Sequence, residues 1–130
     1  IIEKATGKLK AKFITEAFFS FHHVNAWEEG EELIMDINAY DDAGIVQKYY
    51  LKELEKEDLL LPTGTLRRYR FNLRTKKHQA EIVSTACIEL PRIDYNRYNT
   101  DGAYNFTYGV SVHPLNPQGF YNSIVKINSK

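Results

Sequence analysis

Apolar and polar residues alternate with a period of two along most of this chain, a pattern that predicts β-strands. The clearest case is the segment 33–40, whose side chains divide between two faces. One face carries Leu33, Met35, Ile37 and Ala39, and the other carries Ile34, Asp36, Asn38 and Tyr40. The preceding run, residues 18–29, is rich in aromatic and β-prone residues, and a break at Gly30 separates the two runs. A hairpin that turns near Gly30 is therefore predicted.

Two later segments alternate in the same way. Within residues 65–74, the apolar positions Tyr69, Phe71 and Leu73 alternate with Arg68, Arg70, Asn72 and Arg74. The polar cluster 75–79 predicts a turn, and residues 80–84 begin the return strand. Further on, one face of a strand would carry Tyr104, Phe106, Tyr108, Val110 and Val112, with polar or small residues on the other. Residues 122–130 predict a last strand.

Residues 51–60 depart from this pattern, because apolar residues at helical spacing are separated there by charged ones. Pro62 and Gly64 end this predicted helix, which is short and belongs to a connection between strands. Six or so strands with short polar turns indicate an all-β fold, either a sandwich, a barrel or a propeller. A propeller blade takes about 40–50 residues, so a chain of this length cannot close a propeller by itself.

Composition narrows the classes of function. Lysine plus arginine and aspartate plus glutamate number 17 each, and the resulting zero net charge argues against a nucleic-acid partner. No apolar run approaches the ~20 residues of a membrane-spanning helix. The single Cys87 rules out an internal disulfide. A lone cysteine suits a reducing compartment, so a cytoplasmic protein is expected.

Two adjacent histidines, His22 and His23, are the first candidates for chemistry. Neighbouring side chains of a regular strand point to opposite faces, so at most one of them can bind a given metal ion. A histidine on a strand is more often structural, and this pattern alone leaves both interpretations open. His78 lies in the predicted turn and is expected to be exposed, and His113 precedes Pro114 in a predicted loop. The chain has no Cys-x-x-Cys motif or carboxylate-rich loop that would complete a zinc or calcium site.

Four segments, in order along the chain, resemble motifs of the carotenoid cleavage oxygenase family. The first is FHHVNAWE at 21–28, which resembles the pattern F-H-x-x-N-A-aromatic-E. The second is TLRRYRFNL at 65–73, and the third is IELPRIDYNRYN at 88–99, similar to E-[LF]-P-[RQ]-I-[ND]. The fourth is YNFTYG at 104–109. Together these segments extend over most of the chain.

The resemblance implies a seven-bladed β-propeller with one Fe(II) on its axis, held by four histidines from separate blades. It implies that His22 is one of these iron ligands and that His23 is not. It also implies that Glu89 accepts the N–H of a ligating imidazole and so fixes its orientation. Without the resemblance, Glu89 would be interpreted as a solvated carboxylate at a strand edge. The other three ligands have no counterpart here, because His78 and His113 match no ligand motif.

The resemblance therefore predicts that residues 1–130 are an internal fragment of such an enzyme, a partial propeller with one short connecting helix and no complete domain. The parent would be a non-haem Fe(II) dioxygenase that adds O2 across a double bond of a carotenoid or apocarotenoid, giving two carbonyl products. Cleavage of β-carotene to retinal at the 15,15' bond is favoured over eccentric cleavage or isomerisation. The fragment alone is predicted to be inactive. Peripheral membrane contact of the parent is a further expectation.

Two interpretations from other classes remain open. The chain could be a small all-β binding module for a lipid or a protein, which needs no metal. It could also be a non-catalytic relic of the family that ends at Lys130. Flanking sequence would discriminate between them, since three further histidines on strands would indicate an enzyme.

Overall fold

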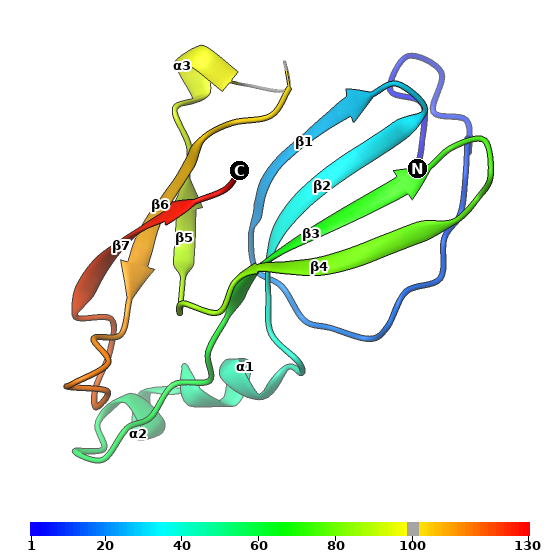
Figure 1. Cartoon of the computed structure of the whole chain (residues 1–130). Coiled ribbons are helices and arrows are strands. Elements are labelled where there is room, and N and C mark those ends of the chain that lie inside the picture. The colour runs from blue at the N-terminus through cyan, green and yellow to red at the C-terminus, as the bar shows by residue number, and fades with distance from the viewer. Residues whose placement is uncertain (99–101) are drawn as a thin grey trace.

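The structure is a computed structural model that describes residues 1–98 and 102–130 (Figure 1). The strands are β1 (His23–Glu29), β2 (Glu32–Ala39), β3 (Thr65–Asn72), β4 (His78–Ser84), β5 (Glu89–Arg92), β6 (Phe106–Ser111) and β7 (Ser123–Asn128). The helices are α1 (Gly44–Lys48), α2 (Leu51–Leu54) and α3 (Tyr95–Tyr98). Asn99, the last residue of the third motif, lies outside the described residues.

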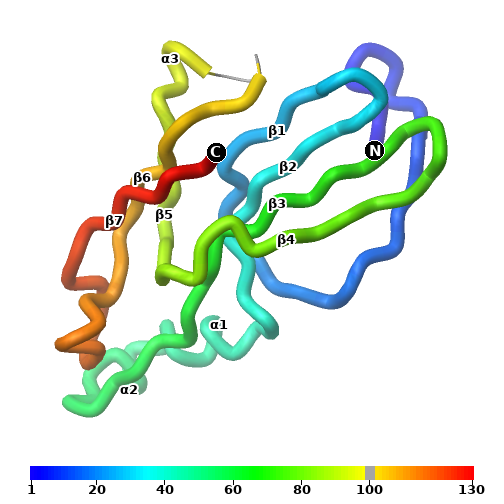
Figure 2. The backbone as a smooth tube through the Cα atoms, in the orientation of Figure 1, coloured from blue at the N-terminus to red at the C-terminus, as the bar shows by residue number. Residues whose placement is uncertain are grey.

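The strands form two antiparallel sheets, one with the order β1-β2-β3-β4 and one with the order β5-β6-β7. Figure 2 shows the two sheets side by side, with α1 and α2 beyond the end at which β1 and β5 begin. The prediction of a mostly β fold is confirmed. Within the described residues the two sheets do not close into a propeller.

The first hairpin turns where the sequence predicted. β1 ends at Glu29 and β2 begins at Glu32, with Gly30 between them at φ +59°. A glycine adopts this left-handed conformation without the steric cost that a Cβ would bring. The turn sets the register that places Trp27 opposite Ile34.

The second hairpin differs from the prediction at its turn. The return strand β4 begins at His78, two residues before the predicted start at residue 80, because Asn72 closes a tight turn. The Asn72 Oδ1 accepts the backbone N–H of Arg74 and of Thr75, and its carbonyl accepts that of Lys76. His78 is consequently half-buried and paired with Phe71. The expectation that His78 would be exposed in the turn is wrong.

The predicted single helix over 51–60 is also wrong in extent and number. Helix α2 ends at Leu54, and α1 and α3 add two further short helices among the described residues. Beyond α2 the chain turns to meet a distant loop. The Leu59 carbonyl accepts the N–H of Gly119, and Leu60 forms an isolated bridge with Gln118. These pairings replace the helical bonds that the leucine spacing had favoured.

Both faces of the first sheet are covered. The face toward the second sheet contributes to a core of Val24, Trp27, Ile34, Leu66, Ile88, Ile93, Tyr104 and Ile127. On the other face, Ile1, Phe13 and Phe18 of the amino-terminal segment pack against side chains of β2 and β3. Figure 2 shows this segment running along the first sheet. Strand β2 is therefore central and buried on both sides, including its polar residues.

A buried polar network joins the two sheets, which the sequence did not predict. Arg68 binds Asp36 through two hydrogen bonds of 2.8 Å, and its Nη2 also donates to the Ser129 carbonyl. The Tyr104 hydroxyl donates to Asp36 Oδ2 at 2.6 Å and accepts from Thr107. The Asp36 carboxylate beside Arg68 raises the pKa of the guanidinium, and burial raises the pKa of Tyr104.

The same network explains the orientation of β6. Thr107 is fully buried within it, whereas Phe106 and Tyr108 on the opposite face are 37% and 41% exposed. The alternation located the strand correctly. The polar face, however, is the one that is buried, because Thr107 bonds there to the hydroxyls of Tyr104 and Ser129.

Candidate functional site

The two residues singled out in the sequence lie at equivalent places in the two sheets. His22 immediately precedes β1, and Glu89 is the first residue of β5. Each of these strands is the first of its sheet, and Figure 1 shows them running in the same direction along adjacent edges. His22 Nδ1 lies 2.7 Å from Glu89 Oε2, although 67 positions separate the two residues in the chain.

Local backbone geometry brings His22 to this place. A bulge in the β1–β2 pairing falls between His23 and Asn25, so β1 is not a regular strand at its start. The His22 carbonyl accepts the backbone N–H of Asn38 at 3.1 Å and the hydroxyl of Ser20 at 3.2 Å. These two bonds hold the main chain of His22 against β2.

Glu89 is held by an equally specific backbone. The following residue, Leu90, has φ +48°, which is rare for a bulky side chain and is further disfavoured because Pro91 follows. Its N–H donates to Glu89 Oε2 at 2.7 Å. On the neighbouring strand, a Cβ at Gly109 would lie 2.6 Å from the Glu89 carbonyl oxygen. A glycine is needed there for β6 to approach β5 this closely.

The Glu89 carboxylate is 2% exposed and surrounded by hydrogen-bond donors. Its Oε2 is shared by His22 and the Leu90 N–H, and its Oε1 accepts from the Asn38 amide and the Tyr40 hydroxyl. Each oxygen thus has two partners, which satisfies the demand that a buried carboxylate makes on its surroundings.

The carboxylate defines what His22 can do. A carboxylate can only accept hydrogen bonds, so Nδ1 is the N–H donor to Oε2, and in a neutral imidazole Nε2 then keeps its lone pair. The His22 side chain is 36% exposed, so it is not enclosed by these residues. A neutral imidazole oriented by a carboxylate is the arrangement in which histidine binds transition metals. The residues present therefore fit one ligand of such a metal.

His23 has a different environment. It is exposed and lies opposite Ile37 in the β1–β2 ladder. Among the described residues it forms no side-chain hydrogen bond or ion pair. The structure thus brings His22, and not His23, to Glu89. The metal role of His22 stays a prediction.

A cluster of tyrosines adjoins the carboxylate at Oε1. The Tyr40 hydroxyl lies 3.4 Å from that of Tyr121, which lies 2.7 Å from that of Tyr49. Phe21 stacks on Tyr49 at a centroid distance of 5.6 Å. Burial raises the pKa of all three phenols above the ordinary value of 10.0. Tyr40 therefore remains protonated and donates to Glu89 over the physiological pH range.

The remaining candidate positions lie apart from this pair. His113 is exposed in a loop, as predicted. Its Nδ1 accepts the N–H of Leu115. The described residues contain no group of three His, Cys, Asp or Glu side chains that could hold a metal ion. No helix in the same part of the chain is long and apolar enough to cross a membrane.

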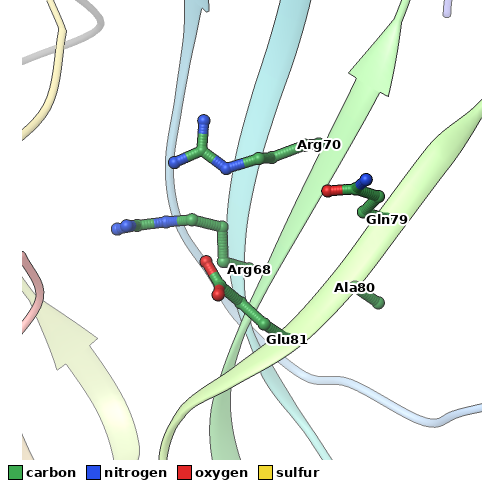
Figure 3. A pocket seen from close by; sticks show the side chains of 5 residues that line it. All are labelled: Arg68, Arg70, Gln79, Ala80 and Glu81. Atoms are coloured by element: carbon green, nitrogen blue, oxygen red, sulfur yellow. The ribbon is translucent and has the colours of Figure 1, made fainter.

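A hollow of about 410 Å³ lies on the first sheet, lined by Arg68, Arg70, Gln79, Ala80 and Glu81 (Figure 3). The residues that line it are mostly polar, and they include neither His22 nor Glu89. Arg68 is already committed to Asp36, and Arg70 lies within 3.8 Å of Glu29 and Glu32. The chemistry of the His22–Glu89 pair is therefore not located in this hollow.

Sequence reasoning missed the residues that complete the site. Asn38 and Tyr40 were assigned only to one face of a strand, with no partner predicted for them, and nothing marked Leu90 as a donor. One signal was available in the sequence. Asp36, Asn38 and Tyr40 share a face with Ile34 on a strand whose other face is wholly apolar, which is typical of a strand buried on both sides.

Comparisons with known proteins identify the family of this chain. The family model described as retinal pigment epithelial membrane protein matches residues 1–130. Beta,beta-carotene 15,15'-dioxygenase of Homo sapiens is 30% identical over 146 residues, covering 88% of this chain and 27% of the relative. The same enzyme of Rattus norvegicus is 38% identical, with 88% and 26% covered. Carotenoid isomerooxygenase of Galleria mellonella is 26% identical over all of this chain and 26% of its own length.

Solved structures share the fold. A crystal structure of an ACO/RPE65 chimera superimposes with a TM-score of 0.78 at 21% identity, covering 99% of this chain and 26% of that one. Cobalt-substituted Synechocystis ACO gives a TM-score of 0.72 at 22% identity, with 90% and 24% covered. The chain spans about a quarter of the length of these relatives. From the match along its whole length, this chain belongs to the retinal pigment epithelial membrane protein family, that of the carotenoid oxygenases.

Proposed function

We propose that the protein containing this chain is a non-haem Fe(II) dioxygenase that cleaves a carotenoid double bond with O2 to give two carbonyl products. The observation that carries the proposal is the 2.7 Å contact between His22 and the buried Glu89. Family membership supports it, because several relatives are named as carotenoid dioxygenases. The two sheets would be consecutive blades of a seven-bladed propeller, whose remaining blades would supply three further histidine ligands.

In this proposal His22 is the iron ligand and Glu89 its orienting residue. Glu89 accepts a hydrogen bond from the Nδ1–H of His22, which selects the tautomer with a free Nε2 and fixes the plane of the ring. Iron bound by neutral imidazoles would supply open coordination positions for O2. His23 takes no part, because it does not reach the carboxylate.

The substrate is proposed from the relatives. The human and rat proteins are named for the 15,15' bond of β,β-carotene, which favours central cleavage to retinal. The Galleria mellonella relative is named as a carotenoid isomerooxygenase. Cleavage of the carotenoid combined with isomerisation of a product is therefore the second candidate activity. Chromatography of the products from all-trans β-carotene separates the two, since only the second yields a cis retinoid.

The location of the protein is part of the proposal. We expect a cytoplasmic enzyme with peripheral membrane contact, since its polyene substrate is apolar. The alternatives are a small all-β binding module and a relic without catalysis. The mass of the natural gene product separates these from the enzyme. An antibody against residues 67–79 should detect a band several times heavier than 15.1 kDa, and a band at this mass would overturn the proposal.

The decisive experiment substitutes the two adjacent histidines in the full-length protein. His22→Ala should abolish iron binding and carotenoid cleavage, whereas His23→Ala should retain most of both. Iron content by metal analysis and product yield are measured on the same preparations. Equal loss of iron in the two variants would refute the assignment. Because the residues are adjacent, each variant is the control for the other.

A further inference from the structure

We infer that Asn38 is a positioning residue that fixes both members of the His22–Glu89 pair through one side chain and one backbone amide. This inference rests on the proposed function, because the pair is taken to serve a bound metal. Asn38 belongs to none of the four motifs that resemble the family. Its role comes from its contacts alone.

Asn38 is the one described residue that bonds to both members of the pair. Its backbone N–H donates to the His22 carbonyl at 3.1 Å, and its side-chain Nδ2 donates to Glu89 Oε1. The first bond fixes the position of the His22 main chain along β2. The second sets the rotation of the carboxylate, whose other oxygen receives the imidazole N–H. A single residue therefore links the position of the ring to the position of its acceptor.

The amide of Asn38 is confined to this orientation. The residue has no exposed surface, and its Oδ1 has no hydrogen-bond partner in the structure. The Asn38 and Tyr40 side chains pack directly against Gly64. A Cβ at this position would lie 2.6 Å from Asn38 Oδ1 and 2.8 Å from Tyr40 Cζ. The carboxylate accepts only N–H or O–H donors, so the opposite amide orientation would place two oxygens together. The orientation in which Nδ2 donates to Glu89 therefore leaves the buried Oδ1 without a partner.

Tyr40 does not duplicate this function. Its hydroxyl donates to the same Oε1 at 3.1 Å but also lies next to Tyr121. Without the Asn38 amide, Oε1 would keep only this longer bond, and the carboxylate could rotate about its terminal torsion. Such terminal torsions have broad minima, so the buried donors determine the angle. The imidazole would follow the carboxylate, and metal affinity would fall.

The test uses the full-length protein, with Co(II) as a spectroscopic probe of the metal site. Asn38→Leu removes the amide at similar volume, and Asn38→Asp places a second carboxylate against Glu89. Both retain the backbone N–H, so they isolate the side chain. We expect the Co(II) dissociation constant to rise about tenfold in Asn38→Leu and further in Asn38→Asp, within the usual range for residues behind a ligand. The visible Co(II) spectrum should change in both.

The matched control is Asn25→Leu. Asn25 is also a buried asparagine, on the neighbouring strand, and its Nδ2 has no hydrogen-bond partner in the structure. Its substitution should leave the Co(II) affinity and spectrum unchanged. A second readout needs no metal. The ¹⁵N resonances of the His22 ring in the metal-free protein should shift toward mixed tautomers in the two Asn38 variants and not in the control.

Each outcome decides the inference. Wild-type Co(II) affinity and spectrum in both Asn38 variants, with metal loss in His22→Ala, would overturn it and leave the proposed function standing. Equal Co(II) binding in wild type and His22→Ala would overturn both. Failure of both Asn38 variants to fold would assign the side chain to the fold and would also overturn it. Weakened binding and an altered spectrum in folded Asn38 variants would establish it.

Discussion

Glu89→Gln is the sharpest perturbation of the proposed site, because it changes one oxygen and retains the shape of the side chain. The carboxylate accepts two bonds at each oxygen, and an amide provides only one accepting atom. If the new NH2 group took the place of Oε2, it would face two other donors, the N–H groups of His22 and Leu90. If it faced Asn38 and Tyr40, the carboxylate that holds the Asn38 amide in its orientation would be gone. The amide could then flip so that Oδ1 accepts, and the Tyr40 hydroxyl could accept as well.

The second orientation is therefore favoured, and the contact to His22 survives without its negative charge. A hydrogen bond to a charged acceptor contributes about 1.5–3 kcal/mol against about 1 kcal/mol for a neutral pair. The difference corresponds to roughly a 10-fold loss of metal affinity, at the lower end of the 10- to 100-fold usual for such positions. Glu89→Ala should lose more, because it removes the acceptor that four donors share.

Titration of the metal-free, full-length protein with Fe(II) under anaerobic conditions measures both losses. Carotenoid turnover, measured on the same samples, should fall in the same order. The free energy of unfolding of the metal-free variants separates metal loss from unfolding. Wild-type iron affinity in Glu89→Gln and in Glu89→Ala would refute the role of the carboxylate.

Three further predictions concern the fold around the site and are measured by urea unfolding of the full-length protein. Leu90→Gly should raise the free energy of unfolding by about 1 kcal/mol, because glycine adopts φ +48° without strain; a decrease would show that Leu90 is not strained. Tyr104→Phe should lower it by about 1–3 kcal/mol, because the buried Asp36 loses a donor, and an unchanged value would contradict the network. Burial raises the pKa of Tyr69 from 10.0 to about 12, so the folded state holds this proton more tightly and loses stability as the pH rises through that window. Tyr69→Phe should remove that part of the alkaline loss, and an identical pH profile would exclude it.

The sequence by itself determined the strands, and its resemblance to the family singled out the two residues of the pair. Alternation along segment 33–40 and along β3 located both hairpins, although the return strand of the second begins two residues earlier than predicted. Motif resemblance selected His22 over His23, and the structure brings His22 alone to Glu89. Local signals sufficed here, since turn chemistry and side-chain period act over a few residues.

Only the tertiary structure decided which polar residues are buried and what they bind. The alternation put Asp36 and Asn38 on one face of β2 without showing that this face is buried. The second sheet covers it, and the partners of the two residues come from β3 of the same sheet, from β5 and from Tyr104. The spacing of the leucines in 51–60 favoured a helix, but Leu59 and Leu60 instead pair with Gly119 and Gln118 of a distant loop. In each case the partner lies tens of residues away, and burial removes the water that would otherwise have satisfied the polar group. Its hydrogen bonds must then be found in whatever the fold brings alongside.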